Sequence, residues 1–256
     1  MDLPRPVPAS ALGALLLAAG LSLPVVATAQ DDALPLDPDS RIVVREIVEG
    51  DSTRGWSASA RIPAIEGPAA EDPGWRAFES ALDSIVRGQI EEFRENLAEW
   101  EEPAGDEWAS FLEADGSVAW VEPPLLSLIL DVSVYYAGAA HPGHYAITLV
   151  WDAARGHALE PDDLFLPGSN WPAALSRAAI PALERDLGEM ADAAWIAEGA
   201  GPSAQNFSRW ALVADGLLVL FDPYQVAPYA AGPQGVTIPR AALADVADPA
   251  GPLAPR

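Results

Sequence analysis

DPGWRAFESALDSIVRGQIEEFRENLAEW, residues 72–100, is the stretch that decides the fold of this chain. Asp72 followed by Pro73 is typical of a helix N-cap and first helical position. After them, apolar residues recur every three or four positions, and most acidic residues lie between them. These apolar residues are Trp75, Phe78, Leu82, Ile85, Val86, Ile90, Phe93, Leu97 and Trp100. The pattern predicts a helix over about 73–102, ended by Pro103, with one broad apolar face that packs on a sheet.

Runs of alternating or β-branched residues on both sides of this helix predict the strands of that sheet. These runs cover residues 42–48, 56–62, 128–136, 145–151, 210–214, 217–221 and 236–239. Asp215-Gly216 joins two of the runs and is typical of a two-residue type I′ hairpin turn. A second helix is expected over about 171–190, with Pro181 kinking or splitting it. The predicted fold class is therefore α+β, with antiparallel sheets and two packed helices.

The composition excludes several kinds of chemistry. The chain has 256 residues and no cysteine, so disulfides, thiolate metal sites and cysteine nucleophiles are excluded. It also has no lysine, which excludes Schiff-base chemistry. The formal net charge of −24 argues against nucleic acid, whose binding depends on cationic neutralisation of phosphates. The same charge favours basic partners.

The first 29 residues have the order of a secretory signal peptide. A short polar segment with Arg5 precedes an uncharged apolar run, Ala11 to Leu23, and a small-residue site follows at Ala27-Thr28-Ala29. The apolar run is short for a spanning helix, which needs about 20 residues. We therefore expect a periplasmic or secreted protein with no stable membrane insertion after cleavage. An uncleaved N-terminal anchor is the alternative.

Several short segments in the second half resemble a known family. Residues 135–142, YYAGAAHP, are followed by Asp163-Leu164-Phe165, then by FDPYQVAPYAAG at 221–232, and finally by VTIP at 236–239. In this order they resemble the domain of unknown function at the C-terminus of the RsiV anti-sigma factor. The preceding residues, about 41–120, resemble the companion domain that RsiV shares with PdaC-type proteins.

The resemblance implies a domain organisation and a location. Together with the signal pattern and the proline-bearing composition of the ends, it divides the chain into a signal peptide (1–29), a disordered leader (30–40), a PdaC/RsiV-like part (41–121), an RsiV-like domain (122–246) and a flexible tail (247–256). In RsiV this region lies outside the cell and binds lysozyme. The deacetylase activity of PdaC resides in a separate catalytic domain, so the resemblance implies no deacetylase chemistry here.

Aromatic residues in or beside these segments are the candidate ligand-binding residues. They are Tyr135, Tyr136, His141, His144, Tyr224 and Tyr229. Tyrosines in loops and at strand ends suit recognition of sugars or proteins, since each presents a large ring and a polar tip. The alternative is structural: the tyrosines close a sheet edge, and His141-Pro142 shapes a turn.

A metal-assisted hydrolase acting on an envelope polymer is the rival function. His141 and His144 flank a Pro-Gly turn, and with Asp131 or Asp152 they would supply a His/His/carboxylate set. The chain contains no G-x-S-x-G, H-E-x-x-H or phosphate-binding glycine motif. The sequence therefore favours a binding or sensing module without a cofactor, whose partner is an envelope protein or polysaccharide, over an enzyme.

Overall fold

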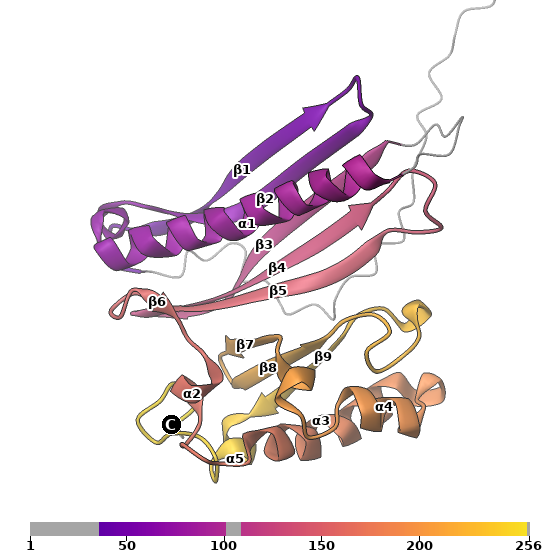
Figure 1. The fold of residues 1–256 in the computed structure, drawn as a ribbon. Coiled ribbons are helices and arrows are strands. Elements are labelled where there is room, and N and C mark those ends of the chain that lie inside the picture. Colours follow the sequence, from indigo (N-terminus) through magenta and orange to yellow (C-terminus); the bar gives the residue numbers. More distant parts are fainter. Residues whose placement is uncertain (1–35, 101–108, 255–256) are drawn as a thin grey trace, which may run out of the picture.

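A computed structural model describes residues 36–100 and 109–254 of the chain. The predicted signal peptide and most of the predicted leader lie outside these residues. The described part has four layers: helix α1, a six-stranded sheet, a three-stranded sheet, and the helices around α3. In Figure 1, α1 crosses the large sheet in the upper half, and the small sheet and α3 lie below. The α+β class predicted from the sequence is confirmed.

The two sheets are formed by strands that follow one another along the chain. The large sheet contains β1 (Arg41–Asp51), β2 (Trp56–Glu66), β3 (Ser110–Glu122), β4 (Leu125–Tyr135), β5 (Gly143–Asp152) and β6 (His157–Ala158), in that spatial order. The small sheet contains β7 (Trp210–Val213), β8 (Gly216–Phe221) and β9 (Gln234–Pro239). All pairs are antiparallel except β2–β3, which is parallel because α1 carries the chain back along the sheet.

The helices cover the outer faces of the two sheets. The α-helices are α1 (Pro73–Glu99), α2 (Pro161–Leu164), α3 (Trp171–Leu187), α4 (Ala193–Gly199) and α5 (Arg240–Leu243). Short 3₁₀ turns are η1 (Pro68–Glu71), η2 (Gly188–Met190), η3 (Ala204–Phe207) and η4 (Tyr229–Ala231). The second predicted helix corresponds to α3 followed by η2, and α3 continues through Pro181 without a break. No helix among the described residues has the length and apolar character needed to span a membrane.

Helix α1 lies where the periodicity predicts. The Asp72 side chain caps it by accepting hydrogen bonds from the backbone N–H groups of Gly74 and Trp75, at 2.7 and 3.3 Å. Its apolar face includes Phe78 and Phe93, which are buried against the large sheet. Each fully buried side chain of this size contributes about 1.5–3 kcal/mol. Packing on the sheet, rather than helix propensity alone, therefore holds α1 in place.

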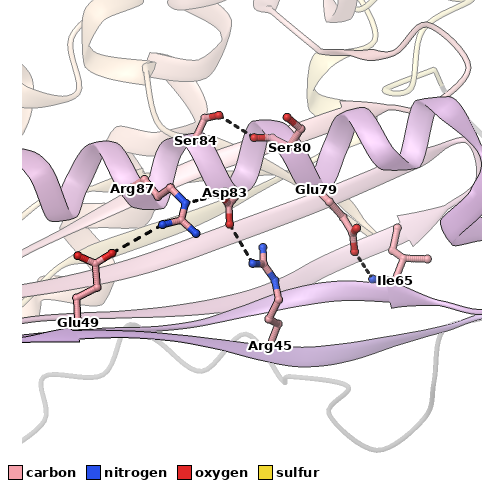
Figure 2. A network of polar contacts seen from close by, with 8 residues as sticks. All are labelled: Arg45, Glu49, Ile65, Glu79, Ser80, Asp83, Ser84 and Arg87. Carbon is pink, nitrogen blue, oxygen red and sulfur yellow. Dashed lines mark hydrogen bonds and ion pairs between the residues drawn. The ribbon is translucent and has the colours of Figure 1, made fainter.

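Polar contacts along its flank fix α1 to the edge of the sheet, as Figure 2 shows. Asp83 accepts a 2.9 Å hydrogen bond from Arg45 on β1 and also binds Arg87. These hydrogen bonds, from Arg87 first and Arg45 second, lower the pKa of Asp83. Glu79 accepts a 2.7 Å hydrogen bond from the backbone N–H of Ile65 on β2. The two strands at this edge are thus tied to the helix through its side chains.

The small sheet is buried on both faces. In β8, Leu218 and Leu220 face the large sheet and pack near Ile129 and Ala146. The intervening Leu217, Val219 and Phe221 pack instead with α3 and its neighbours. Burial on both sides explains why this strand has a continuous apolar sequence rather than an alternating one.

Three sequence expectations need correction. The expected division at 121/122 falls within the β3–β4 hairpin of one sheet, so residues on both sides of it share one core. The tail expected to be flexible from 247 is packed as far as it is described: Ala247 bridges to Phe165, and Leu253 is fully buried. Local composition suggested fraying, but the tertiary contacts of these apolar side chains prevail.

The third correction concerns the β7–β8 hairpin. Val213 pairs with Gly216, so the two loop residues are Ala214 and Asp215, one position earlier than expected. None of the three loop-region residues from 214 to 216 has the positive φ that a type I′ turn requires. Gly216 instead lies in the strand, where a Cβ would stand 2.1 Å from the carbonyl oxygen of Ile238 on β9. The glycine serves close strand packing, not the turn.

The face of the large sheet opposite α1 carries a row of charges. Asp115 on β3 lies directly opposite Asp131 on β4. Arg61 on β2 forms ion pairs with Asp115 at 3.3 Å and with Glu46 at 3.8 Å. Desolvation by the surrounding protein, and then repulsion from Asp115, raise the pKa of Asp131 to about 6, although its outer edge is exposed. Like charges placed directly opposite each other destabilise a sheet.

We expect Asp131→Asn to stabilise the protein at pH 8 but not at pH 3.5. The folded-state pKa of Asp131 lies above the unfolded value of about 3.9, so stability falls as pH rises between these values. Because the side chain is partly exposed, screening should limit the gain to about 0.5–1 kcal/mol. Urea unfolding at both pH values measures it. Glu113→Gln, on the same strand face but opposite Ser133, is the matched control and should change less.

Two glycines in α1 should respond in opposite ways to alanine. A Cβ at Gly74 would lie 1.8 Å from the carbonyl oxygen of Ala153, so Gly74→Ala should displace the helix and cost at least about 2 kcal/mol. Gly88 is exposed with nothing within 4 Å of a Cβ. Gly88→Ala should therefore stabilise by about 0.5–1 kcal/mol. Equal effects of the two changes in thermal unfolding would contradict the described packing of α1.

Candidate recognition site

Two loops that are about 80 residues apart in the sequence meet at one end of the sheets. One joins β4 to β5, and the other joins β8 to β9. The ring of His141 stacks on Tyr229, with centroids 4.0 Å apart and an interplanar angle of 29°. His144 and Tyr224 lie 6.4 and 5.7 Å from the same Tyr229 ring. These four residues form what we call the aromatic cluster, and four of the six predicted ligand-binding residues belong to it.

A shared carbonyl holds the two loops together. The Tyr229 hydroxyl donates a 2.9 Å hydrogen bond to the carbonyl oxygen of Pro142. Nδ1 of His141 lies 2.9 Å from the same oxygen. This contact requires the hydrogen to be on Nδ1, since a carbonyl oxygen only accepts. Both rings of the stacked pair are therefore held by polar contacts to the same carbonyl oxygen, and these contacts use ring edges rather than ring faces.

Gln225 organises the loop that carries the tyrosines. Its side-chain oxygen accepts a 3.2 Å hydrogen bond from the backbone N–H of Asp222. Its side-chain nitrogen donates to the carbonyl oxygens of Gly199 and Asn206, both at 3.0 Å. A Cβ at position 199 would lie only 1.9 Å from the Gln225 carbonyl oxygen, so the glycine is required there. The loop is thus bound to the end of α4 rather than free to move.

Tyr224 has an unusual backbone conformation. It is the one described non-glycine residue with positive φ, at 70°. Its side chain is 56% exposed, so burial of the ring does not explain the conformation. Its carbonyl oxygen accepts a 3.0 Å hydrogen bond from the indole N–H of Trp195 on α4. A left-handed backbone costs a non-glycine residue about 1 kcal/mol or more, and such strain concentrates at functional sites.

An ion pair anchors this loop to the large sheet. Arg209 pairs with Asp222 at 2.8 Å, and its Nε donates a 2.8 Å hydrogen bond to the carbonyl oxygen of Ala146 on β5. The backbone N–H of Ala146 donates in turn to Asp222 at 3.4 Å. Burial raises the pKa of Asp222, and the charge of Arg209 opposes this rise. The pair sets the loop position next to the strand that carries His144.

Burial shifts the pKa values of two rings in the cluster, those of His144 and Tyr229. Burial, and then the charge of His141, lower the pKa of His144 below its usual value. Burial, and then the neighbouring Tyr224, raise the pKa of the Tyr229 phenol. Both shifts favour the neutral imidazole of His144 and the neutral phenol of Tyr229. The π faces and hydrogen-bonding edges of these rings suit stacking on a sugar ring, an aromatic residue or a cationic side chain.

Tyr135 and Tyr136 are not part of the aromatic cluster. Tyr135 stacks on Phe111 of β3, with centroids 5.6 Å apart. Tyr136 points to the other side of the sheet, where it packs against Phe93 and Trp100. Their adjacent positions in the strand direct them to opposite faces, so they could not both join one surface.

The predicted metal set is not formed. Asp152 ends β5, whereas His144 lies at its start, so a strand length of roughly 25–30 Å separates them. Asp152 instead accepts hydrogen bonds from the backbone N–H groups of Ala154 and Arg155 and shapes the next turn. Within residues 36–100 and 109–254, no group of three or more His, Asp or Glu side chains has the arrangement to hold a metal ion.

Sequence patterns do not indicate the residues that support the cluster. Arg209 belongs to no predicted motif, and Gln225 belongs only to the 221–232 segment. Their partners are backbone carbonyls that only the folded chain brings near. Two surface depressions occur elsewhere, one around Asp37 to Arg41 and one around Val48 to Ser52, and the cluster residues line neither. The chemistry of the cluster, not a cavity, makes it the candidate.

The curated proteins to which the chain is similar include an enzyme and an immunogenic protein. The chain is 26% identical over 169 residues to the peptidoglycan-N-acetylmuramic acid deacetylase PdaC of Bacillus subtilis, covering 66% of this chain and 36% of PdaC. It is 28% identical over 122 residues to the immunogenic protein MPT64 of Mycobacterium tuberculosis, covering 47% of this chain and 52% of MPT64. The chain thus spans about a third to a half of these relatives.

Two solved structures share the fold. A DUF3298 family member from Bacteroides fragilis has a TM-score of 0.55 at 16% identity, covering 82% of this chain and 93% of that one. A DUF3298 family protein from Pseudomonas aeruginosa has a TM-score of 0.52 at 18% identity, covering 86% of this chain and 98% of that one. Residues 162–241, which include the small sheet and the tyrosines of the aromatic cluster, match the family described as protein of unknown function DUF3298.

Proposed function

We propose that this protein is an exported envelope binding module that recognises its ligand through the aromatic cluster. The observation that carries the proposal is Tyr224: an exposed ring on a strained backbone, next to a stacked tyrosine and histidine from two distant loops. The surrounding hydrogen bonds hold this arrangement before any ligand arrives. A preformed aromatic surface loses little entropy on binding, which favours recognition.

The charge of the chain favours a basic protein as the ligand. A net charge of −24 accelerates encounter with cationic partners and repels anionic ones. Arginine or lysine side chains of such a partner would make cation–π contacts with the rings of Tyr224 and Tyr229. Lysozyme, a basic protein that acts in the cell wall, is the first ligand to test. Peptidoglycan fragments are the second, because peptidoglycan is named in the description of the relative PdaC.

Binding is better supported than metal-assisted hydrolysis. His141 uses Nδ1 for the Pro142 carbonyl, and the ring of each cluster histidine faces Tyr229. Of the two carboxylates considered for a metal set, Asp152 lies at the far end of β5, and Asp131 forms no metal-holding group with the histidines in the described part of the chain. The aromatic cluster therefore offers ring faces that a ligand can contact, and its side chains do not converge on one point as metal ligands do.

The proposal predicts that Tyr224→Gly weakens ligand binding at least tenfold without loss of stability. Glycine adopts φ near 70° at no steric cost, which offsets its greater freedom in the unfolded chain. Removal of a central aromatic anchor typically costs more than about 1.4 kcal/mol of binding free energy. Calorimetric titration with lysozyme and with soluble peptidoglycan fragments measures the affinity, and thermal unfolding measures the stability.

Two variants serve as matched controls. Tyr224→Phe keeps the ring and should retain binding. Tyr136→Phe lies on the other side of the sheet, where the ring packs against Phe93 and Trp100, and should leave binding unchanged. The proposal fails if neither ligand gives saturable binding, or if Tyr224→Gly binds as tightly as the unaltered protein. Association that disappears by about 0.3 M salt, where the Debye length is roughly 6 Å, would be nonspecific attraction and would equally count against it.

A further inference from the structure

Strand β1 forms a free edge of the large sheet. It is first in the strand order, and its only sheet neighbour among the described strands is β2. The two strands pair in one unbroken register over eleven residue pairs, from Arg41 opposite Glu66 to Asp51 opposite Trp56. Figure 1 shows β1 as the outermost strand, on the side away from the small sheet. A long, regular edge strand presents a row of backbone groups that can pair with another strand.

Two valines on this edge are unusually open to solvent. Val44 and Val48 are 55% and 73% exposed, which makes Val48 the most exposed large apolar residue described. Both valines lie two residues from Glu46 and therefore on the same face of the strand as Glu46. Glu46 pairs with Arg61 on the face opposite α1. The intervening Arg45 and Ile47 face α1. The valines thus lie on one face of the edge, placed symmetrically two residues on either side of Glu46.

We propose that β1 pairs in antiparallel fashion with β1 of a second copy of this chain, about a twofold axis at Glu46. Glu46 is the central residue of the strand Arg41–Asp51, so this register pairs the strand along its whole length. It places Val44 of each copy opposite Val48 of the other. The twofold axis is perpendicular to the sheet, so each face continues across the interface. The result is one sheet with an α1 helix from each copy on the same side.

Charge complementarity supports this register. Arg41 lies opposite Asp51 of the second copy, so opposite charges meet at both ends of the paired strands. The two exposed valine pairs bury apolar surface in the same interface, and a cross-strand pair of this kind contributes roughly 0.2–1 kcal/mol. Registers centred on Arg45 or Ile47 would separate Val44 from Val48 and leave residues at the strand ends unpaired.

One contact in this register is unfavourable by itself. The Glu46 side chains of the two copies meet at the axis, and like charges directly opposite each other repel. Arg61 lies 3.8 Å from Glu46 within each copy, so two guanidinium groups accompany the two carboxylates. Arg61 also pairs with Asp115 at 3.3 Å, so the two guanidinium groups reduce the repulsion between the Glu46 side chains but do not cancel it.

The absence of cysteine allows a direct test by crosslinking. Glu46→Cys should form a disulfide-linked dimer under mild oxidation, because directly opposite Cβ atoms are about 4.5–5.5 Å apart. Val44→Cys alone should not, since its symmetry mate lies four residues away along the strand, at roughly 13 Å. A mixture of Val44→Cys and Val48→Cys proteins should crosslink to each other. Ser59→Cys, on the same face but on β2, is the control for random collision.

Analytical ultracentrifugation of the unaltered protein, without any introduced cysteine, measures the association itself. We expect a concentration-dependent dimer that Val48→Lys weakens at least tenfold, because a charged side chain on an edge strand opposes pairing. A monomer up to about 100 µM, or Glu46→Cys that links no faster than Ser59→Cys, would overturn the proposal. A dimer in which Val44→Cys links and Glu46→Cys does not would equally refute it. Neither result bears on ligand binding, because the aromatic cluster lies four strands away.

Discussion

Packing of the small sheet against one face of the large sheet is the constraint on which the rest of this molecule depends. Ile129 and Ala146 from the large sheet meet Leu218 and Leu220 from the small one. Each buried leucine or isoleucine contributes about 1.5–3 kcal/mol to the stability of the fold. This is more than the stability lost to repulsion between Asp115 and Asp131, which lie on the solvent-exposed part of the same face. The interface therefore tolerates a charged neighbour. It also brings the β4–β5 turn and the β8–β9 loop to the same end, which creates the aromatic cluster.

The polar contacts at this end turn proximity into fixed geometry. Apolar packing is non-directional and would allow the two loops to slide relative to each other. The Arg209–Asp222 pair and the bond from Tyr229 to the Pro142 carbonyl prevent this, since each requires a particular distance and angle. The strain at Tyr224 persists for the same reason: Gln225 and Trp195 hold the residues around it.

Sequence patterns over short stretches predicted the helices and strands, because interactions between neighbouring residues largely determine these elements. The helix after Asp72 and the strand alternation followed from periodicity. The role of Gly216 did not follow, because it depends on the approach of Ile238. The buried position of Leu253 also depends on distant partners. Each miss concerns a contact between residues far apart in the sequence, where propensity carries little information.

The two proposed surfaces should respond to salt in opposite ways. Two copies that each carry a net charge of −24 repel one another, so pairing of β1 strands should become tighter as salt screens this repulsion. A basic ligand is attracted by the same charge, so its capture by the aromatic cluster should become weaker over the same salt range. What remains of ligand binding at high salt is the part due to ring contacts. Because the two responses have opposite signs, a salt titration separates self-association from ligand recognition in one sample.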